Sequence, residues 1–586
     1  MKVAACTMMK YKKVKFLPEC LACLLLLLPN LVALFLAEDL GGILPRIYYA
    51  FISVCCFLVP ALLLKARTFF LVQSPLLLLG CIELAHLIIN KTTTSLLFVY
   101  TCMIAEKGEF LELLSTGWLL ALLILCVWGL YIYIIIRYVD NRYLWTTKTR
   151  SYIGIFIGIS FLLIDLTYVD LPDKSKWRIF PIHNETIGNE LLSYTEKVFP
   201  LNLFLSTGRI IHLRKDIKQE ETHVNDFSFG ATYNSSEKET TVVLIIGETA
   251  RYSNFGINGY TRPTTPHLSQ RSHLISFDSV YSIANLTTVS VPFMLSRATP
   301  MHPEIYTHEK SIVDAFSEAG YYTAWIANQS FGNPFLMRIS ENCDYQHYIP
   351  TDVKNHDNLD IRLLDYAQNI MENDSKQKLI VLHSLGCHFK YNLRYPDSFR
   401  YYQPDLSSET PLKDILNPDD NPDIHLKELL EKTDLLEGMR ELLVNSYDNA
   451  ICYTDYFIDS TISMLDAQNK PAVLIYIGDH GENLLDDERH LFLHATYQGS
   501  VYEYHVPLFV WTSDEYRTLH PNVENNLQAN KSKSITSMVL FHSLMEAGHI
   551  SYPQWDASLS IFNPQLRSDS VLYGLDANLK LKQLPK

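Results

Sequence analysis

Five long apolar stretches constrain this chain more than any other feature of its sequence. They cover residues 16–37, 47–65, 69–89, 117–136 and 151–170. An α-helix needs about 20 apolar residues to cross a bilayer. We therefore expect residues 1–170 to form a transmembrane domain of five helices, which excludes a plain soluble enzyme.

The residues between these stretches predict which way the chain faces. Lysine and arginine precede the first stretch and fill the loops after the second and the fourth, whereas the alternate loops carry acidic residues. Basic loops stay in the cytoplasm. An odd number of spans then places all residues after 170 on the side of the membrane away from the cytoplasm. A cleaved signal peptide in residues 1–37, followed by four spans, is an alternative with the same orientation.

Charge divides the chain at the same point. Residues 1–170 hold 14 Lys and Arg against 10 Asp and Glu, while the other 416 residues carry a net charge of −18. Nucleic-acid binding needs clustered positive charge, so we expect no nucleic-acid partner. A hydrophobic content of 48% also excludes a disordered chain. Three scattered cysteines after residue 170 predict neither a disulfide framework nor a cysteine metal site.

The second part of the chain has the pattern of an α/β domain. Residues 171–240 are expected to form a bridging helix and a polar linker. From residue 241 to 586, apolar runs such as TTVVLIIG, KLIVLHS and AVLIYIG alternate with helical segments. This alternation predicts a mostly parallel central sheet covered by helices. Sheets of this kind bind ligands beyond the carboxyl ends of their strands.

Two of the predicted strands end in residues that can bind a metal. VVLIIG is followed by Glu248, and AVLIYIG is followed by Asp479 and His480. Carboxylate oxygens and an imidazole nitrogen are ligands that suit Zn²⁺. We therefore expect a zinc site built from these three residues.

A hydroxyl residue lies between these two segments. Thr287 opens a predicted helix in SIANLTTVSVPFMLSRAT. A helix N-terminus favours an anion, and a nearby metal makes a hydroxyl a better nucleophile. The alternative is that Thr287 only caps the helix.

These segments, in this order behind five spans, resemble the bacterial phosphoethanolamine transferases that modify lipid A and lipopolysaccharide. That family belongs to the alkaline-phosphatase/sulfatase superfamily. The resemblance rests on GETAR, NGYTRPTTP, TTVSVPFMLS, YDNAICYTDYFID and GDHGE. It implies an enzyme in the bacterial inner membrane with a periplasmic sulfatase-like domain, and a role in resistance to polymyxin and other cationic peptides.

The resemblance also implies roles for individual residues. Thr287 would be the nucleophile that carries phosphoethanolamine, and its oxygen would join Glu248, Asp479 and His480 on zinc. His388 and His494 match two further histidines that contact the transferred phosphate or a second metal. Glu109 and Glu112 resemble acidic residues in an outward membrane loop of the family. The resemblance implies that this loop meets the ethanolamine end of the donor.

Two departures from the family pattern limit this assignment. Ile283 and Phe293 stand where family members often have cysteines that bracket the nucleophile loop. Pro292 is not followed two residues later by the Arg that the modified nucleophile of a sulfatase needs, because that position is Met294. Sulfatase activity is therefore not expected.

The implied reaction takes phosphoethanolamine from phosphatidylethanolamine, holds it on threonine and passes it to a lipid A or lipopolysaccharide acceptor. Phosphoglycerol transfer from phosphatidylglycerol would use the same residues and stays an alternative. A membrane-anchored phosphodiesterase, with water as the acceptor, is another. The last alternative is a non-enzymatic membrane sensor or assembly protein with an inactive site. The complete set of Glu, Thr, Asp and His residues argues against this alternative.

Overall fold

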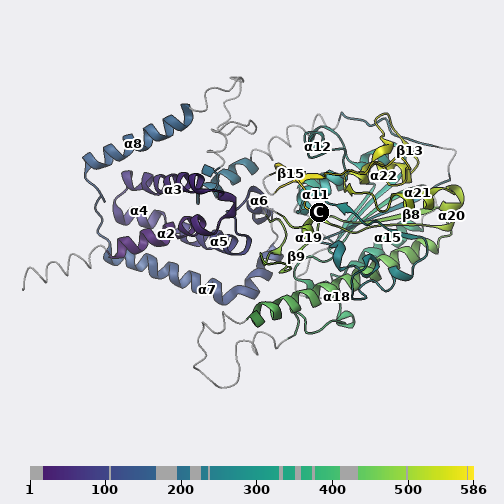
Figure 1. Ribbon diagram of the computed structural model, residues 1–586, viewed down its shortest axis with the longest axis horizontal. Helices are drawn as coiled ribbons and strands as arrows, with labels where there is room; N and C mark the ends of the chain where they lie inside the picture. The colour runs from purple at the N-terminus through teal and green to yellow at the C-terminus, as the bar shows by residue number, and fades with distance from the viewer. Residues whose placement is uncertain are drawn as a thin grey trace, which may run out of the picture. The chain divides into compact units, whose positions relative to one another are not determined.

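The structure is a computed structural model, and the chain forms two compact units in it (Figure 1). The helical unit comprises residues 1–103 and 110–212, and the α/β unit comprises residues 104–109 and 213–586. The residues that the structure describes are 17–104, 107–166, 194–211, 226–234, 238–328, 334–349, 358–372, 377–408, 433–496, 499–576 and 579–586.

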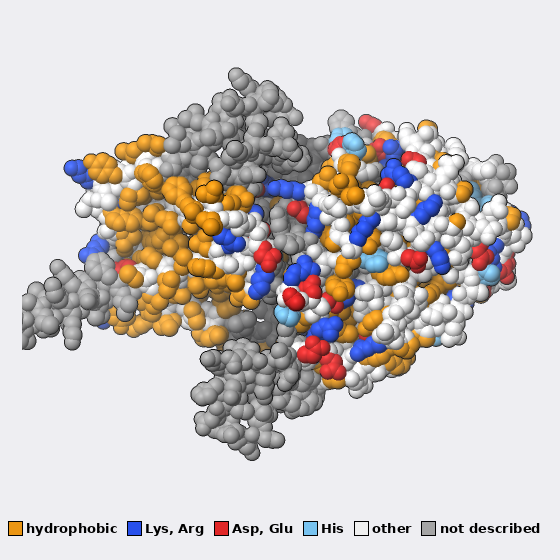
Figure 2. All heavy atoms as spheres, viewed as in Figure 1, with side chains coloured by type: hydrophobic (Ala, Val, Ile, Leu, Met, Phe, Trp, Pro, Cys, Tyr) orange, Lys and Arg blue, Asp and Glu red, His pale blue; other side chains and the backbone are white. Residues whose placement is uncertain are grey.

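Apolar helices dominate the first part of the chain. They are α2 (Leu17–Leu36), α3 (Ile43–Leu63), α4 (Ala66–Val72), α5 (Pro75–Asn90), α6 (Leu96–Ile104), α7 (Lys107–Tyr138) and α8 (Thr147–Leu166). In the described residues, α2, α3 and the second half of α7 are long and apolar enough to cross a membrane. The pair α4 and α5 is a fourth candidate. Hydrophobic side chains cover much of the visible face of the helical unit (Figure 2).

The single helix predicted over residues 69–89 is wrong, because the structure has two helices there with a bend of 48° between them. Pro75 causes the break. It has no N–H to continue the hydrogen-bond ladder of α4, and it stands at the start of α5, where that N–H is not needed.

The predicted fifth span is a helix, α8, but it is shifted toward the N-terminus relative to the predicted 151–170. Its first turns carry Lys148 and Arg150, and residues 167–170 lie outside the described residues. The described part of the chain thus contains three apolar spans, or four if the bent pair is counted as one.

Glu83, an acid within the predicted span 69–89, makes polar contacts between segments. Its carboxylate accepts hydrogen bonds from the Thr94 hydroxyl at 2.7 Å and from Asn202 Nδ2 at 2.8 Å. Asn202 belongs to the helix Leu201–Ile211. This helix is therefore tied to the α5 region by a buried carboxylate. The side chain of Asp165, the other acid within a predicted span, lies outside the described residues.

A seven-stranded sheet forms the centre of the α/β unit, in the order β3-β11-β8-β2-β7-β5-β6. The strands β8, β2, β7, β5 and β6 run parallel, and β11 is antiparallel to both of its neighbours. Their bounds are β2 (Thr241–Gly247), β3 (Leu274–Ser276), β5 (Tyr322–Ala327), β6 (Tyr345–Tyr348), β7 (Lys378–His383), β8 (Ala472–Gly478) and β11 (Leu508–Thr512). The expected mostly parallel sheet is thus confirmed.

Helices cover both faces of this sheet. Alternate residues of β2 belong to different cores: Val242 and Leu244 to one, and Val243 and Ile245 to the other. The first core receives α11 (Thr287–Met294), α13 (Ile312–Glu318), α14 (Pro334–Glu341), α21 (Val523–Asn530) and α22 (Val539–Ala547). The second receives α15 (Leu363–Met371) and α18 (Thr433–Asp466). Burial on both faces explains why the strands read as continuous apolar runs.

Candidate active site

Glu248 and Asp479 are the first residues beyond two neighbouring parallel strands. Gly247 at the end of β2 pairs with Gly478 at the end of β8, so both carboxylates leave the same edge of the sheet. Glu248, Asp479 and the following His480 are buried. One ligand atom from each lies within 4.8 Å of the others. Within the described part of the chain, this is the one group of three such side chains close enough to hold a metal ion.

Asp479 and His480 each make hydrogen bonds to the backbone through one atom of the side chain. Asp479 Oδ1 accepts bonds from the backbone N–H groups of Thr249 and His480, at 2.9 and 2.7 Å. Asp479 Oδ2 is buried and accepts no hydrogen bond from the described residues. His480 Nδ1 donates to the Gly481 carbonyl at 2.8 Å, which leaves Nε2 as the nitrogen with a lone pair. Nε2 lies 3.6 Å from Glu248 Oε1.

The electrostatics of the cluster also favour a cation. Burial raises the pKa of Glu248 to about 7, and the nearby Asp479 charge adds to the effect. Burial likewise raises the pKa of Asp479 to about 7. Burial and the neighbouring His494 lower the pKa of His480 to about 4, so the imidazole is neutral. Two buried carboxylates beside a neutral imidazole fit Zn²⁺, whose charge would offset the cost of ionising both acids.

Thr287 lies against this cluster. Its hydroxyl is 3.0 and 3.1 Å from the two Glu248 carboxylate oxygens and 3.1 Å from His480 Nε2. It is the first residue of α11, and the N-cap position belongs to Leu286. The alternative that Thr287 only caps the helix is therefore wrong, because its hydroxyl bonds to the cluster and not to the helix backbone.

His494 lies beside the same cluster, and its orientation is fixed by a carboxylate. Its ring centroid is 4.3 Å from that of His480. Its Nδ1 is 3.0 Å from Glu482 Oε1. Burial lowers the pKa of His494 to about 4 and raises that of Glu482 to about 8. The predictions from the sequence did not include Glu482, although it is the last residue of the GDHGE motif.

His388 is held in the loop that follows β7. Its Nδ1 donates to the Phe389 carbonyl at 2.7 Å, and its own carbonyl accepts from Arg394 Nε at 2.9 Å. Burial lowers the pKa of His388, and the nearby Glu248 charge opposes that shift. The structure thus brings His388 close enough to Glu248 for their charges to interact.

Gly386 allows this loop to pass close to Glu248. Its φ is +48°, and a Cβ there would lie 2.6 Å from the Glu248 carbonyl oxygen. The N–H groups of Leu385 and Gly386 donate to the buried Asp360 carboxylate at 2.8 and 2.9 Å. The close approach therefore requires glycine and is stabilised by a buried acid.

The side chains of the remaining two predicted site residues, Glu109 and Glu112, lie outside the described part of the structure. The backbone at both positions belongs to α7, and this helix continues into the span predicted over residues 117–136.

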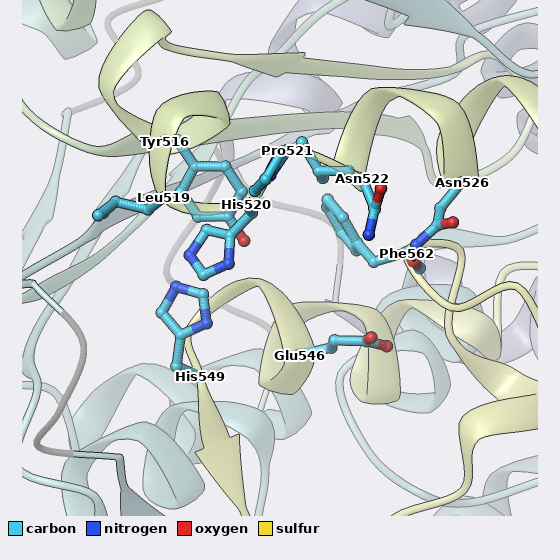
Figure 3. A pocket seen from close by; sticks show the side chains of 10 residues that line it. Tyr516, Leu519, His520, Pro521, Asn522, Asn526, Glu546, His549 and Phe562 are labelled. Carbon is cyan, nitrogen blue, oxygen red and sulfur yellow. Dashed lines mark hydrogen bonds between the residues drawn. The ribbon is translucent and has the colours of Figure 1, made fainter.

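A separate pocket of about 340 Å³ lies elsewhere in the α/β unit (Figure 3). None of the predicted site residues lines it. His520 and His549 stack at a centroid distance of 4.3 Å on one side of it, and Glu546 stands on another. The elements around the pocket follow Thr512, the last residue of β11. Because β11 runs antiparallel to β8, Thr512 pairs with Val473 near the start of β8, whereas Glu248 and Asp479 lie beyond the ends of β2 and β8. The pocket therefore belongs to the opposite edge of the sheet.

The chain matches the family model named Sulfatase over residues 240–550, more than half of its length. It is similar to the phosphoethanolamine transferase EptC of Escherichia coli, with 27% identity over 349 residues. These are 58% of this chain and 56% of the relative, so the match spans little more than half of that relative's length. It is also 30% identical to the Kdo(2)-lipid A phosphoethanolamine 7''-transferase of Salmonella typhimurium, over 47% of this chain and 45% of that protein.

Solved structures show similar folds. The C-terminal periplasmic domain of EptC from E. coli, in complex with Zn, has a TM-score of 0.51 and 25% identity, and the match covers 60% of this chain and 94% of that one. The integral membrane protein EptA from Neisseria meningitidis has a TM-score of 0.63 over 92% of this chain and 97% of that one, at 21% identity. The second likeness covers both parts of the chain and concerns the fold alone.

Proposed function

We propose that this chain, which belongs to the sulfatase family and is similar to phosphoethanolamine transferases, moves phosphoethanolamine from phosphatidylethanolamine to a lipid A or lipopolysaccharide acceptor. Diacylglycerol leaves in the first step. The observation that carries the proposal is the contact of the Thr287 hydroxyl with Glu248 and His480 at the start of α11.

Glu248, Asp479 and His480 hold Zn²⁺ in this proposal. Two observations support that assignment: Asp479 Oδ2 accepts no hydrogen bond from the described residues, and the Nε2 lone pair of His480 faces the Thr287 hydroxyl at 3.1 Å. Bound zinc would lower the pKa of the Thr287 hydroxyl and offset negative charge on the phosphodiester.

The side chains of the protein supply the nucleophile and the proton transfers. The Thr287 hydroxyl gives its proton to Nε2 of the neutral His494 as Oγ1 attacks phosphorus; the bond to the diacylglycerol oxygen breaks, and that oxygen takes the proton back from His494. His494 is suited to deliver it, because Glu482 binds its Nδ1 and leaves Nε2 for the substrate. His388, whose Nδ1 is also occupied, is the second candidate. In the second step the acceptor hydroxyl gives its proton to the same histidine, its oxygen attacks phosphorus, the bond to Thr287 Oγ1 breaks, and Thr287 takes that proton.

The lipid nature of both substrates agrees with the apolar helices. We propose five spans, with α8 as the fifth and the α/β unit in the periplasm of a bacterial inner membrane. The basic residues between the spans support this orientation. Glu109 and Glu112 are proposed to meet the ethanolamine end of the donor. Cysteine accessibility at residues before and after α8 tests the topology, and equal labelling from outside the cell on both sides would contradict it.

The proposed donor and nucleophile can be tested with full-length protein in detergent, supplied with Zn²⁺ and phosphatidylethanolamine carrying a fluorescent head group. We expect diacylglycerol release and a labelled protein adduct, both lost in Thr287→Ala. Thr288→Ala is the matched control, because Thr288 is the adjacent threonine of the same helix and its hydroxyl makes no described hydrogen bond.

Three outcomes would redirect the proposal. Release from phosphatidylglycerol but not from phosphatidylethanolamine would indicate phosphoglycerol transfer. Release of free phosphoethanolamine at the full rate, with no gain from added lipid A, would indicate a phosphodiesterase. Adduct formation in Thr287→Ala would contradict the nucleophile.

A further inference from the structure

Glu503 is a buried carboxylate that belongs to none of the sequence motifs of the site. It lies in the short helix α19 (Val501–Tyr504) and is 0% exposed. Its two oxygens accept five hydrogen bonds from four residues, Asn285, Asn483, Thr496 and Ser500. A buried carboxylate with this many donors is well satisfied and holds its neighbours in one arrangement.

Three of these residues lie close in sequence to Thr287, His480 and His494. Asn285 lies two residues before Thr287, and its Nδ2 donates to Glu503 Oε2. Asn483 lies three residues after His480, and its Nδ2 donates to Glu503 Oε1 at 2.8 Å. Thr496 lies two residues after His494 and donates through its hydroxyl and through its backbone N–H.

Further bonds connect these segments around the carboxylate. Asn285 Nδ2 also donates to the Thr496 carbonyl at 3.0 Å, and the Ala495 N–H donates to the Asn285 carbonyl at 3.1 Å. The backbone carbonyl of Glu503 accepts from the Gly481 N–H at 2.7 Å. Residues 283–289 and 481–496 contain no cysteine, so this network, and not a covalent bond, joins them.

We propose that Glu503 is the positioning residue that sets Thr287, His480 and His494 relative to one another. It does not touch the substrate, and it acts through Asn285, Asn483 and Thr496. The inference rests on the proposed function for the roles of Thr287 and His494. It goes beyond that function because it explains what keeps the segment before α11 in a reactive arrangement with the hairpin of β9 (Asn483–Leu484) and β10 (Phe492–Leu493).

Glu503→Gln is the sharpest test, because glutamine has nearly the same volume but turns one acceptor oxygen into an N–H donor. Both Glu503 oxygens accept hydrogen bonds, so either orientation of the glutamine amide places its NH₂ group against N–H or O–H donors. We expect kcat for diacylglycerol release to fall about 100-fold, which a displacement of about 1 Å can cause. KM and the bound zinc should stay at their wild-type values.

Glu546→Gln is the matched control. Glu546 has a buried carboxylate oxygen and accepts a bond from Asn563 at 3.2 Å, but it lines the pocket at the opposite edge of the sheet (Figure 3). It should keep the wild-type kcat even if its melting temperature falls. A Glu503→Gln variant that melts earlier but keeps its kcat would overturn the proposal, because its role would then be structural only.

A second variant restores one lost pair with its polarity reversed. In Asn285→Asp with Glu503→Gln, the new amide can donate to the new carboxylate, so we expect more activity than in either single variant. A double variant no more active than the worse single variant would overturn the proposal.

Amide hydrogen exchange provides a readout that needs no substrate. We expect residues 283–289 and 491–496 to exchange faster together in Glu503→Gln, and unchanged exchange in both would overturn the proposal. If the wild type releases no diacylglycerol from phosphatidylethanolamine, the proposed function fails, and the exchange experiment still decides the role of Glu503.

Discussion

Replacing Gly386 by alanine should weaken both the stability of the α/β unit and the reactivity of its site. Gly386 has a φ of +48°, and a Cβ there would lie 2.6 Å from the Glu248 carbonyl oxygen and 2.9 Å from its nitrogen. Ordinary contact begins at 3.4 Å, so the two backbones must separate by about 0.8 Å. Neither is a flexible side chain, so the strain reaches the strand end that carries Glu248.

The size of the effect follows from two separate costs. An alanine in the left-handed region costs roughly 1–2 kcal/mol. Forcing extra volume into a packed site costs roughly 1–3 kcal/mol. We therefore expect a loss of about 2–5 kcal/mol in the free energy of unfolding. A shift of Glu248 by a large fraction of an ångström should also lower kcat about 100-fold.

Gly320→Ala isolates the first of these costs. Gly320 has a φ of +82°, and its nearest neighbour would be Gln377 Nε2 at 3.9 Å. This control should lose only about 1–2 kcal/mol and keep its activity. Denaturant unfolding of full-length protein, followed by tryptophan fluorescence, gives the stabilities, and diacylglycerol release gives the activity. Equal losses of stability in the two variants, with activity unchanged in both, would refute the reasoning.

Three further predictions concern the metal and two buried acids. Removing metal with a chelator should abolish diacylglycerol release and lower the melting temperature, and zinc should restore both; activity that survives exhaustive chelation would contradict the zinc site. Arg400→Ala should lower the free energy of unfolding by about 1–3 kcal/mol at pH 7, because the Arg400 guanidinium donates hydrogen bonds of 2.8 and 2.7 Å to the buried Asp405 carboxylate. Burial raises the pKa of Asp405, but the hydrogen bonds from Arg400, Tyr395 and Ser407 and the Arg400 charge together outweigh burial and lower the pKa overall. The stabilisation is therefore present above the unfolded pKa and is lost as pH falls through the folded pKa. A difference in stability between variant and wild type that is constant from pH 7 to pH 3 would contradict it. Asn202→Ala should destabilise the helical unit by about 1–3 kcal/mol, because it removes a donor from the buried Glu83; an unchanged melting temperature in detergent would count against that role.

Periodicity and strand-end chemistry made much of the α/β unit predictable. TTVVLIIG and AVLIYIG are continuous apolar runs because both faces of their strands are buried, and they became β2 and β8. The residue after each run, Glu248 or Asp479, could be identified as a site candidate because parallel strands present their carboxyl ends at one edge.

Other features could not be predicted, because they depend on contacts between distant segments. Apolarity alone predicted one helix over residues 69–89, and it could not weigh the missing N–H of Pro75 against continued helix. Nothing near Glu503 in the sequence indicates its role, since its donors Asn285 and Asn483 are 218 and 20 residues away. Hydrogen-bond partners at such separations leave no periodic signal.

The sequence by itself determined the division into an apolar first part and an acidic α/β part, the strand runs, and the identity of the residues that can bind metal and carry a nucleophile. These follow from local composition and from the period of the backbone. Only the tertiary structure decided that the Thr287 hydroxyl lies 3.0 Å from Glu248, and that the buried Glu503 carboxylate joins the segment before Thr287 to the hairpin that follows His480. The reason is physical: burial in the folded chain brings these groups together and removes the water that would otherwise bind each of them separately.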